Sequence, residues 1–175
     1  MADNLKHLPE KTPTILQLLE FFPNFQLEEQ RELCRYLKLG GQEMKMVERV
    51  ASIRNDLESP FEPQRWCHRY AHPQFNSELE VVLARLPKER KQEFRKFHQE
   101  KRALYSPHIE QIASKKTFVK SSTLQALGIF PGKEMGLLLK EAERIALMHY
   151  LVEEDQLLEL LKNTALWRTI KENQK

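Results

Sequence analysis

Hydrophobic side chains recur along most of this chain at intervals of three and four residues. Because an α-helix turns once every 3.6 residues, that spacing places them on one helix face. Four stripes are clearest. They consist of Leu27, Leu33 and Leu37; of Met44, Val47, Val50, Ala51 and Leu57; of Trp66, Cys67 and Tyr70; and of Leu79, Val82, Leu83 and Leu86. The sequence contains no Asn-Gly hairpin signal and no sustained alternation of polar and apolar residues. The pattern therefore predicts an all-α protein, a multi-helix bundle of short antiparallel helices joined by short loops.

Proline, glycine and serine residues indicate where these helices begin and end. Helix starts are predicted at Pro13, Pro63, Pro87 and Pro131, with Ser77 as an N-cap. Helix ends are predicted at Gly40-Gly41, Ser59-Pro60 and Gly128. The helix that Pro87 opens is long and charged and reaches about Ser106, after which Pro107 starts or kinks the next one. Acidic residues open a further helix at 153–155. Along the chain we expect an N-terminal extension over 1–12, a helical region over 13–106 and a second one over 107–175.

The composition is ordinary for a globular protein, with 41% hydrophobic and 30% charged residues in 175. The two cysteines, Cys34 and Cys67, have no CxxC or zinc-site spacing, and we interpret them as reduced thiols. No apolar run approaches the length of a membrane span, and the first residues lack the apolar core of a signal peptide. We therefore expect a cytoplasmic protein without a membrane partner.

Positive charge is concentrated in one part of the chain. Residues 87–120 contain ten Lys and Arg against four Asp and Glu, whereas the net charge of the whole chain is only +3. On a helix, four of these cations fall near one face, along roughly 20 Å at 1.5 Å per residue: Lys88, Lys91, Arg95 and Arg102. Such a stripe matches several backbone phosphates of a duplex. The alternative is a solvated face on which Glu89 and Glu93 pair with neighbouring bases.

The same helix also carries apolar residues, and Phe94, Phe97 and Leu104 are expected to mark the face that packs on the core. Three lysines follow it and extend the basic character towards a turn in the C-terminal third: Lys115, Lys116 and Lys120. A local basic block of this kind favours nucleic acid as a partner more than the modest overall charge does.

That turn predicts an anion-binding site between two helices. Gly128 ends a short helix where the left-handed conformation is common, and glycine adopts it without a Cβ clash. Pro131 suits the first turn of the next helix, whose unpaired N–H groups lie near Gly132 and Lys133 at the positive end of the helix dipole. Such a helix start can hold a phosphate. Gly136, one turn further on, would provide clearance. The alternative is plain helix packing in which the glycines serve only for clearance.

The same turn carries a resemblance to a known family. The segment around this turn resembles the C-terminal body and tail of class II tRNA nucleotidyltransferases. The resemblance is carried by Leu127-Gly128-Ile129 and by Pro131-Gly132-Lys133-Glu134-Met135-Gly136, which is followed by Leu-Leu-Leu-Lys-Glu. This family comprises the CCA-adding enzymes and the bacterial poly(A) polymerases. Tyr70-Ala71-His72-Pro73 is similar to a segment of bacterial members, and the resemblance spans roughly Pro13 to Thr164. It implies a helical body and tail that grip the acceptor stem and elbow of tRNA, while a catalytic head performs the chemistry.

The motifs of that head do not occur in this sequence. Nucleotidyl transfer requires clustered carboxylates that hold two Mg²⁺ ions, whereas the chain has three aspartates, no Asp-x-Asp pair and no Asp-x-x-Arg. Mg²⁺ would therefore belong to a separate catalytic head, which is one expected partner. We expect this chain to bind tRNA or another structured RNA without transferring nucleotides itself. The residues predicted to contact RNA are Lys88, Lys91, Arg95, Arg102, Lys115, Lys116, Lys120, Gly132 and Lys133.

Two other functional classes are alternatives to an RNA-binding protein. The run from Leu124 to Gly132 also resembles a helix-hairpin-helix element, which holds DNA backbones through loop amides. In that motif one residue usually separates the loop glycines, whereas here Phe130 and Pro131 intervene. The second alternative is a helical protein-interaction domain with no nucleic-acid role.

His68 and His72 could share a helix face, but the sequence offers no matching third ligand for a metal ion.

Overall fold

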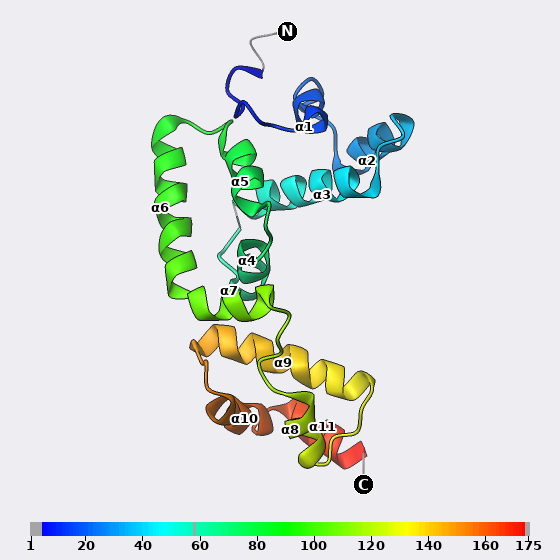
Figure 1. The fold of residues 1–175 in the computed structure, drawn as a ribbon, viewed down its shortest axis with the longest axis vertical. Coiled ribbons are helices and arrows are strands. Elements are labelled where there is room, and N and C mark those ends of the chain that lie inside the picture. Colours follow the sequence, from blue (N-terminus) through cyan, green and yellow to red (C-terminus); the bar gives the residue numbers. More distant parts are fainter. Residues whose placement is uncertain (1–4, 58, 174–175) are drawn as a thin grey trace. The chain divides into compact units, whose positions relative to one another are not determined.

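A computed structural model describes residues 5–57 and 59–173, and in these ranges the regular elements are α-helices, without any strand (Figure 1). The eleven described helices are α1 (Thr14–Leu19), α2 (Leu27–Tyr36), α3 (Gly41–Asp56), α4 (Pro63–Tyr70), α5 (Phe75–Leu83), α6 (Lys88–Leu104), α7 (Ser106–Ala113), α8 (Ser121–Ala126), α9 (Lys133–His149), α10 (Glu154–Lys162) and α11 (Ala165–Asn173). The all-α, multi-helix bundle predicted from the periodicity is thus confirmed.

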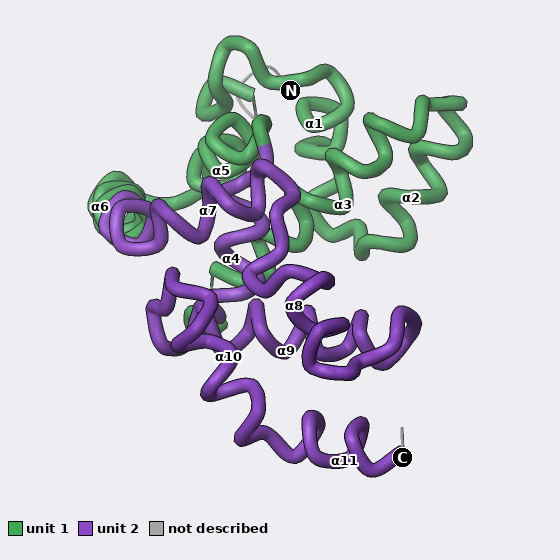
Figure 2. Tube along the Cα trace, turned by 60° about the horizontal axis from the view of Figure 1, so that its bottom comes forward, with its two compact units in different colours: residues 1–61, 73–98 green, residues 62–72, 99–175 purple. Residues whose placement is uncertain are grey.

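Contacts between the helices divide the chain into two compact units (Figure 2). The first unit comprises residues 1–61 and 73–98, and the second comprises residues 62–72 and 99–175. α4 therefore belongs to the second unit, where it packs against α7 and α9, although α3 and α5 on either side of it in sequence belong to the first. α6 is continuous through residue 98 and contributes residues to both units. The division of the sequence at residues 12 and 106 stays a prediction.

α3 is the central helix of the first unit and packs against α1, α2 and α5. Val47 and Val50 of the stripe predicted for α3 are buried, and Ile53, which that stripe did not include, is buried with them. Burying a side chain of this size contributes about 1.5–3 kcal/mol. The carboxylate of Glu20 is also buried here, where it accepts a hydrogen bond of 2.8 Å from Nε of Arg85. A buried carboxylate needs such a partner because an unpaired charge is costly to remove from water.

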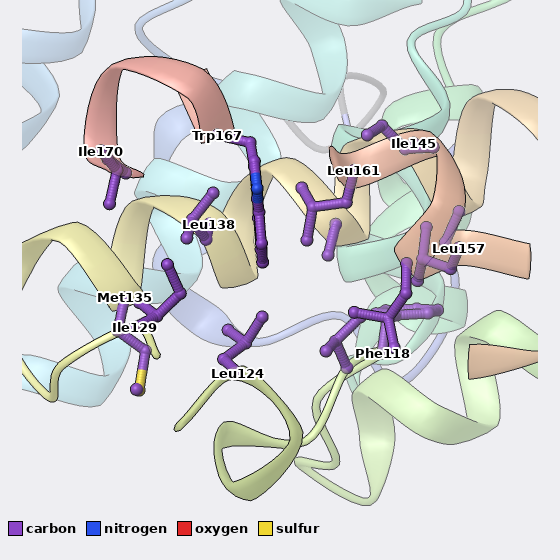
Figure 3. Close-up of a cluster of buried hydrophobic side chains, with 14 residues drawn as sticks. Phe118, Leu124, Ile129, Met135, Leu138, Ile145, Leu157, Leu161, Trp167 and Ile170 are labelled. Carbon is purple, nitrogen blue, oxygen red and sulfur yellow. The ribbon is translucent and has the colours of Figure 1, made fainter. Parts of the chain in front are cut away.

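The hydrophobic core of the second unit lies among α8, α9, α10 and α11. Figure 3 shows Leu124, Leu138 and Leu161 around the indole of Trp167, one side chain from each of these helices. Leu124, Leu138 and Leu161 have no exposed surface. α8, α10 and α11 have only six, nine and nine residues and would be marginal in isolation, so packing of their apolar faces accounts for most of their stability.

The end of α2 differs from the prediction. Gly40 and Gly41 were expected to close α2, but the helix ends at Tyr36 and Gly40 is instead the residue that precedes α3. Lys38 closes α2 in the left-handed conformation, with φ of 52°. The N–H of Leu39 then donates to the carbonyl of Cys34 at 3.0 Å, which is the hydrogen bond of a Schellman motif. The glycines did not predict the helix end correctly because Lys38 adopts the left-handed conformation that is usually found at glycine.

The start of α5 also differs from the prediction. Ser77 was expected to cap this helix, but α5 begins at Phe75, so Ser77 lies within its first turn. Its hydroxyl donates to the backbone carbonyl of Gln74 at 2.8 Å. A serine in the first turn can bond back to the chain in this way, and the sequence alone does not distinguish that position from an N-cap.

Candidate nucleic-acid interface

The packed face of α6 differs in part from the one predicted. Phe94 is partly buried and its ring stacks on that of His98, so it lies on the packed side as expected. Among its described residues only His98 is buried, whereas Phe97 and Leu104 are 38% and 50% exposed. Because successive residues turn by about 100°, Phe97 and Leu104 lie roughly 100–120° from His98 around the helix axis. The expectation that these two residues mark the core face was therefore wrong. A buried histidine carries no hydrophobic signal, so the apolar spacing placed the packed face too far towards Phe97 and Leu104.

The glutamates of α6 are not paired with the cations of the same helix. Glu89, Glu93 and Glu100 lie on one side, and none of them forms an ion pair with another described residue. Lys88 and Lys91, which lie on the predicted stripe, likewise form no ion pair within the described ranges. The i,i+4 pairing with Glu89 and Glu93 that would make this a self-neutralised face is thus not formed. The two lysines keep their charge available to an external anion.

The two arginines of the predicted stripe are already engaged within the protein. Nε of Arg95 donates to Oε1 of Glu80 at 3.0 Å, and a second nitrogen of the same guanidinium donates to Oε2. These hydrogen bonds with Glu80 raise the pKa of Arg95 above its ordinary value. The guanidinium of Arg102 lies over the ring of Tyr70, 5.8 Å from its centroid. The stripe therefore consists of two lysines that pair with no acid in the described ranges and two arginines with protein partners.

The three lysines that follow α6 differ from one another. Lys115 and Lys116 are exposed and form no ion pair with a described residue, and Lys115 ends α7 in the left-handed conformation, with φ of 55°. The backbone N–H of Lys120 donates to Oε1 of Glu154 at 2.9 Å, and its Nζ lies 3.7 Å from Oε2. This backbone hydrogen bond is the main cause of the lowered pKa of Glu154. Lys120 is therefore partly neutralised, whereas the two preceding lysines are not.

The turn between α8 and α9 begins as predicted. Gly128 has a φ of 80°, and the N–H of Ile129 donates to the carbonyl of Leu124 at 3.0 Å, which closes α8. Nζ of Lys171, from α11, donates to the carbonyl of Leu127 at 3.0 Å. A cation at the C-terminus of a helix is favourable because it compensates the negative end of the dipole. The predicted left-handed glycine is thus confirmed.

The second half of this turn differs from the prediction at two positions. α9 begins at Lys133, so Pro131 precedes the helix and does not occupy its first turn. Gly132 is the N-cap, and its φ of 150° favours glycine. A Cβ added at Gly136 would meet nothing within 4 Å, so the clearance expected there is not needed. Lys133 is exposed and has no ion-pair partner among the described residues, as an anion site at this turn would require.

The predicted RNA-binding residues fall in both units. Lys88, Lys91 and Arg95 belong to the first, and the remaining six residues belong to the second. One exposed lysine of α6 without an ion pair to a described residue, Lys96, was not predicted, because it lies off the stripe. The excess of basic residues in 87–120 was the signal that could have included it.

A polar contact between α4 and α9 was not predicted either. Nε2 of His68 lies 2.7 Å from Oε1 of Glu143, which also accepts a hydrogen bond of 2.9 Å from the amide of Gln64. This hydrogen bond with Glu143 raises the pKa of His68. His72 lies beyond the end of α4 at Tyr70, so the two histidines do not share a helix face. These hydrogen bonds connect α4 to α9 within the second unit.

Neither a metal centre nor a membrane span is formed by the described part of the chain. In residues 5–57 and 59–173 there is no group of three or more His, Cys, Asp or Glu side chains placed to hold a metal ion. No helix within these ranges has the length and apolar character needed to cross a membrane.

Comparisons of the chain with known protein families, with curated proteins and with solved structures found no match.

Proposed function

We propose that this chain binds structured RNA, tRNA above all, through electrostatic contacts with backbone phosphates and does not transfer nucleotides by itself. The proposal is supported chiefly by the lysines that have no ion-pair partner among the described residues: Lys88 and Lys91 of α6, and Lys115 and Lys116 after α7. A lysine without an internal partner can neutralise a phosphate, and the counterions released in that step drive binding.

The resemblance to class II tRNA nucleotidyltransferases favours RNA over DNA as the ligand. It also favours a supporting role, in which helices hold the RNA and a separate catalytic head adds the nucleotides. A-form RNA presents phosphates and 2′-hydroxyls in a shallow groove and hides its base edges, so shape and charge dominate its recognition. Phosphate contacts position a ligand and carry little sequence information. We therefore expect similar affinities for many tRNAs.

The test is a binding titration with tRNA at two salt concentrations, using the double variant Lys88→Gln/Lys91→Gln. Losing two phosphate contacts should weaken binding to every tRNA and reduce the slope of log K against log salt by about two. The matched control is Lys45→Gln/Lys162→Gln, which removes the same charge at two exposed helical lysines outside the basic block. Equal affinities and equal salt slopes for the two double variants would overturn the assignment of this site.

The same titration distinguishes the alternative classes. A helix-hairpin-helix protein would bind duplex DNA more tightly than tRNA, and its affinity would depend on the α8–α9 turn and not on α6. A helical protein-interaction domain would bind neither nucleic acid at the lower salt concentration. Measuring tRNA and duplex DNA side by side therefore separates the proposed function from both.

A further inference from the structure

The ion pair between α5 and α6 in the first unit has the geometry of a phosphate contact. The carboxylate of Glu80 accepts hydrogen bonds from two nitrogens of the Arg95 guanidinium, one of them Nε at 3.0 Å. A guanidinium binds carboxylates and phosphates with the same pair of parallel N–H donors. Glu80 therefore occupies the donors that Arg95 would use to bind an RNA phosphate.

This pair is placed where an external anion can compete for it. The side chains of Arg95 and Glu80 are 52% and 40% exposed, so both are in contact with solvent. An exposed ion pair contributes little net stability, because water and salt screen it and both side chains lose freedom on forming it. Exchange of the carboxylate for a phosphate is therefore a small perturbation of the fold.

Glu80 is held close to Arg95 by the packing of α5. Its neighbours in sequence, Leu79 and Val81, are buried, so the backbone of this turn is fixed in the first unit. Glu78, the other acid of this helix, is buried and paired with Arg49 at 2.7 Å, so it is not placed as a second partner for Arg95. The carboxylate of Glu80 is thus the specific competitor, presented by a rigid element.

We propose that Glu80 masks Arg95 from RNA, so that Arg95 joins Lys88 and Lys91 in phosphate binding only when a phosphate displaces the Glu80 carboxylate. The proposal rests on the proposed RNA binding and adds an intramolecular competitor to that site. As a consequence, the wild-type protein binds RNA more weakly than it would if Glu80 were absent.

The test is the variant Glu80→Gln, which keeps the size of the side chain and removes its charge. Its tRNA affinity should rise about three- to fivefold, the factor that corresponds to an exposed ion pair. Because one more phosphate is neutralised, the slope of log K against log salt should steepen by about one. Circular dichroism would verify that the variant keeps the helical fold.

The matched control is Glu93→Gln, which removes a charge from an exposed glutamate of α6 that forms no ion pair with a described residue. It reports the general effect of one less negative charge near the lysines. The double variant Glu80→Gln/Arg95→Gln should lose the gain of Glu80→Gln, since the unmasked cation is no longer present.

The outcomes are distinct for the two proposals. If wild type binds tRNA and Glu80→Gln binds no more tightly than Glu93→Gln, the masking role is refuted and RNA binding stands. A gain that persists without Arg95 also refutes masking, because it would come from charge alone. Absence of tRNA binding by wild type and Glu80→Gln alike refutes the proposed function, and masking with it.

Discussion

Replacing Gly136 with alanine is expected to stabilise the second unit, and replacing Gly128 with alanine is expected to destabilise it. Both glycines lie near the α8–α9 turn, which carries the family resemblance, but their backbone conformations differ. Gly136 is within α9, whereas Gly128 follows α8 with φ of 80°. The comparison therefore separates a glycine that the fold requires from one that it does not.

The expected gain at Gly136 follows from helix propensity and free space. Alanine is favoured over glycine in a helix interior by about 0.5–1 kcal/mol, because glycine loses more backbone freedom on folding. A Cβ at this position meets nothing within 4 Å, so no steric cost opposes that gain. We expect Gly136→Ala to raise the free energy of unfolding by roughly 0.5–1 kcal/mol.

The expected loss at Gly128 has two causes. A left-handed backbone costs an L-residue about 1–2 kcal/mol relative to glycine. In addition, the new Cβ would lie 3.1 Å from Nζ of Lys171, whose hydrogen bond to the carbonyl of Leu127 would have to shift. Gly128→Ala should therefore lower the free energy of unfolding by at least about 1–2 kcal/mol.

The assay is thermal and urea unfolding of wild type and both variants under the same conditions. For a chain of this size, 1 kcal/mol corresponds to a change in Tm of about 2–4 °C, so the two variants should differ by several degrees. A Gly136→Ala protein with a lower Tm than wild type would show that the position is sterically restricted, and the structural reasoning would be wrong. A Gly128→Ala protein as stable as wild type would contradict the need for a left-handed residue there.

Three further predictions concern the second unit and the absence of catalysis. Because Glu143 raises the pKa of His68, this pair contributes stability that is full below the unfolded histidine pKa near 6.5 and is lost as pH rises through the folded value. Urea unfolding at pH 5.5 and 8 should show that loss in wild type and not in His68→Gln, and equal pH dependence would contradict it. Leu161→Ala should cost about 2–5 kcal/mol, far more than Leu160→Ala, because Leu161 is fully buried and Leu160 is 38% exposed; similar urea midpoints for the two would refute this. The purified chain should incorporate no labelled CMP or AMP into tRNA, and incorporation free of contaminating enzyme would overturn the expectation.

The proposed masking also changes how the basic block should be probed. Neutralising Arg95 alone removes a cation that is already paired with Glu80, so its effect on RNA affinity in wild type should be smaller than that of Lys88 or Lys91. A substitution at Gly132 is a poor probe of an anion site, because its φ of 150° makes any other residue costly for the fold itself. Lysine variants therefore test phosphate binding more cleanly than glycine variants.

Local signals in the sequence were sufficient to predict the helices and several of their ends. The three- and four-residue spacing predicted Val47 and Val50 of α3, which are buried. Pro63, Pro87 and Pro107 were expected near the starts of helices that begin there. Gly128 was predicted to be left-handed because few other residues adopt that conformation at a helix end without cost. These properties depend on the backbone and on residues a turn apart, so one sequence contains the necessary information.

The tertiary structure decided which side of each helix is covered and which charges are left without a partner. The spacing within α6 could not show that buried His98, rather than Phe97 or Leu104, marks its packed face, because that depends on residues distant in sequence. Nor could it show that Arg95 is paired with Glu80, fifteen positions away on another helix, while Lys88 and Lys91 have no such partner among the described residues. A helical sequence determines where its charges lie around its own axis, but the availability of each charge depends on what the fold places beside it.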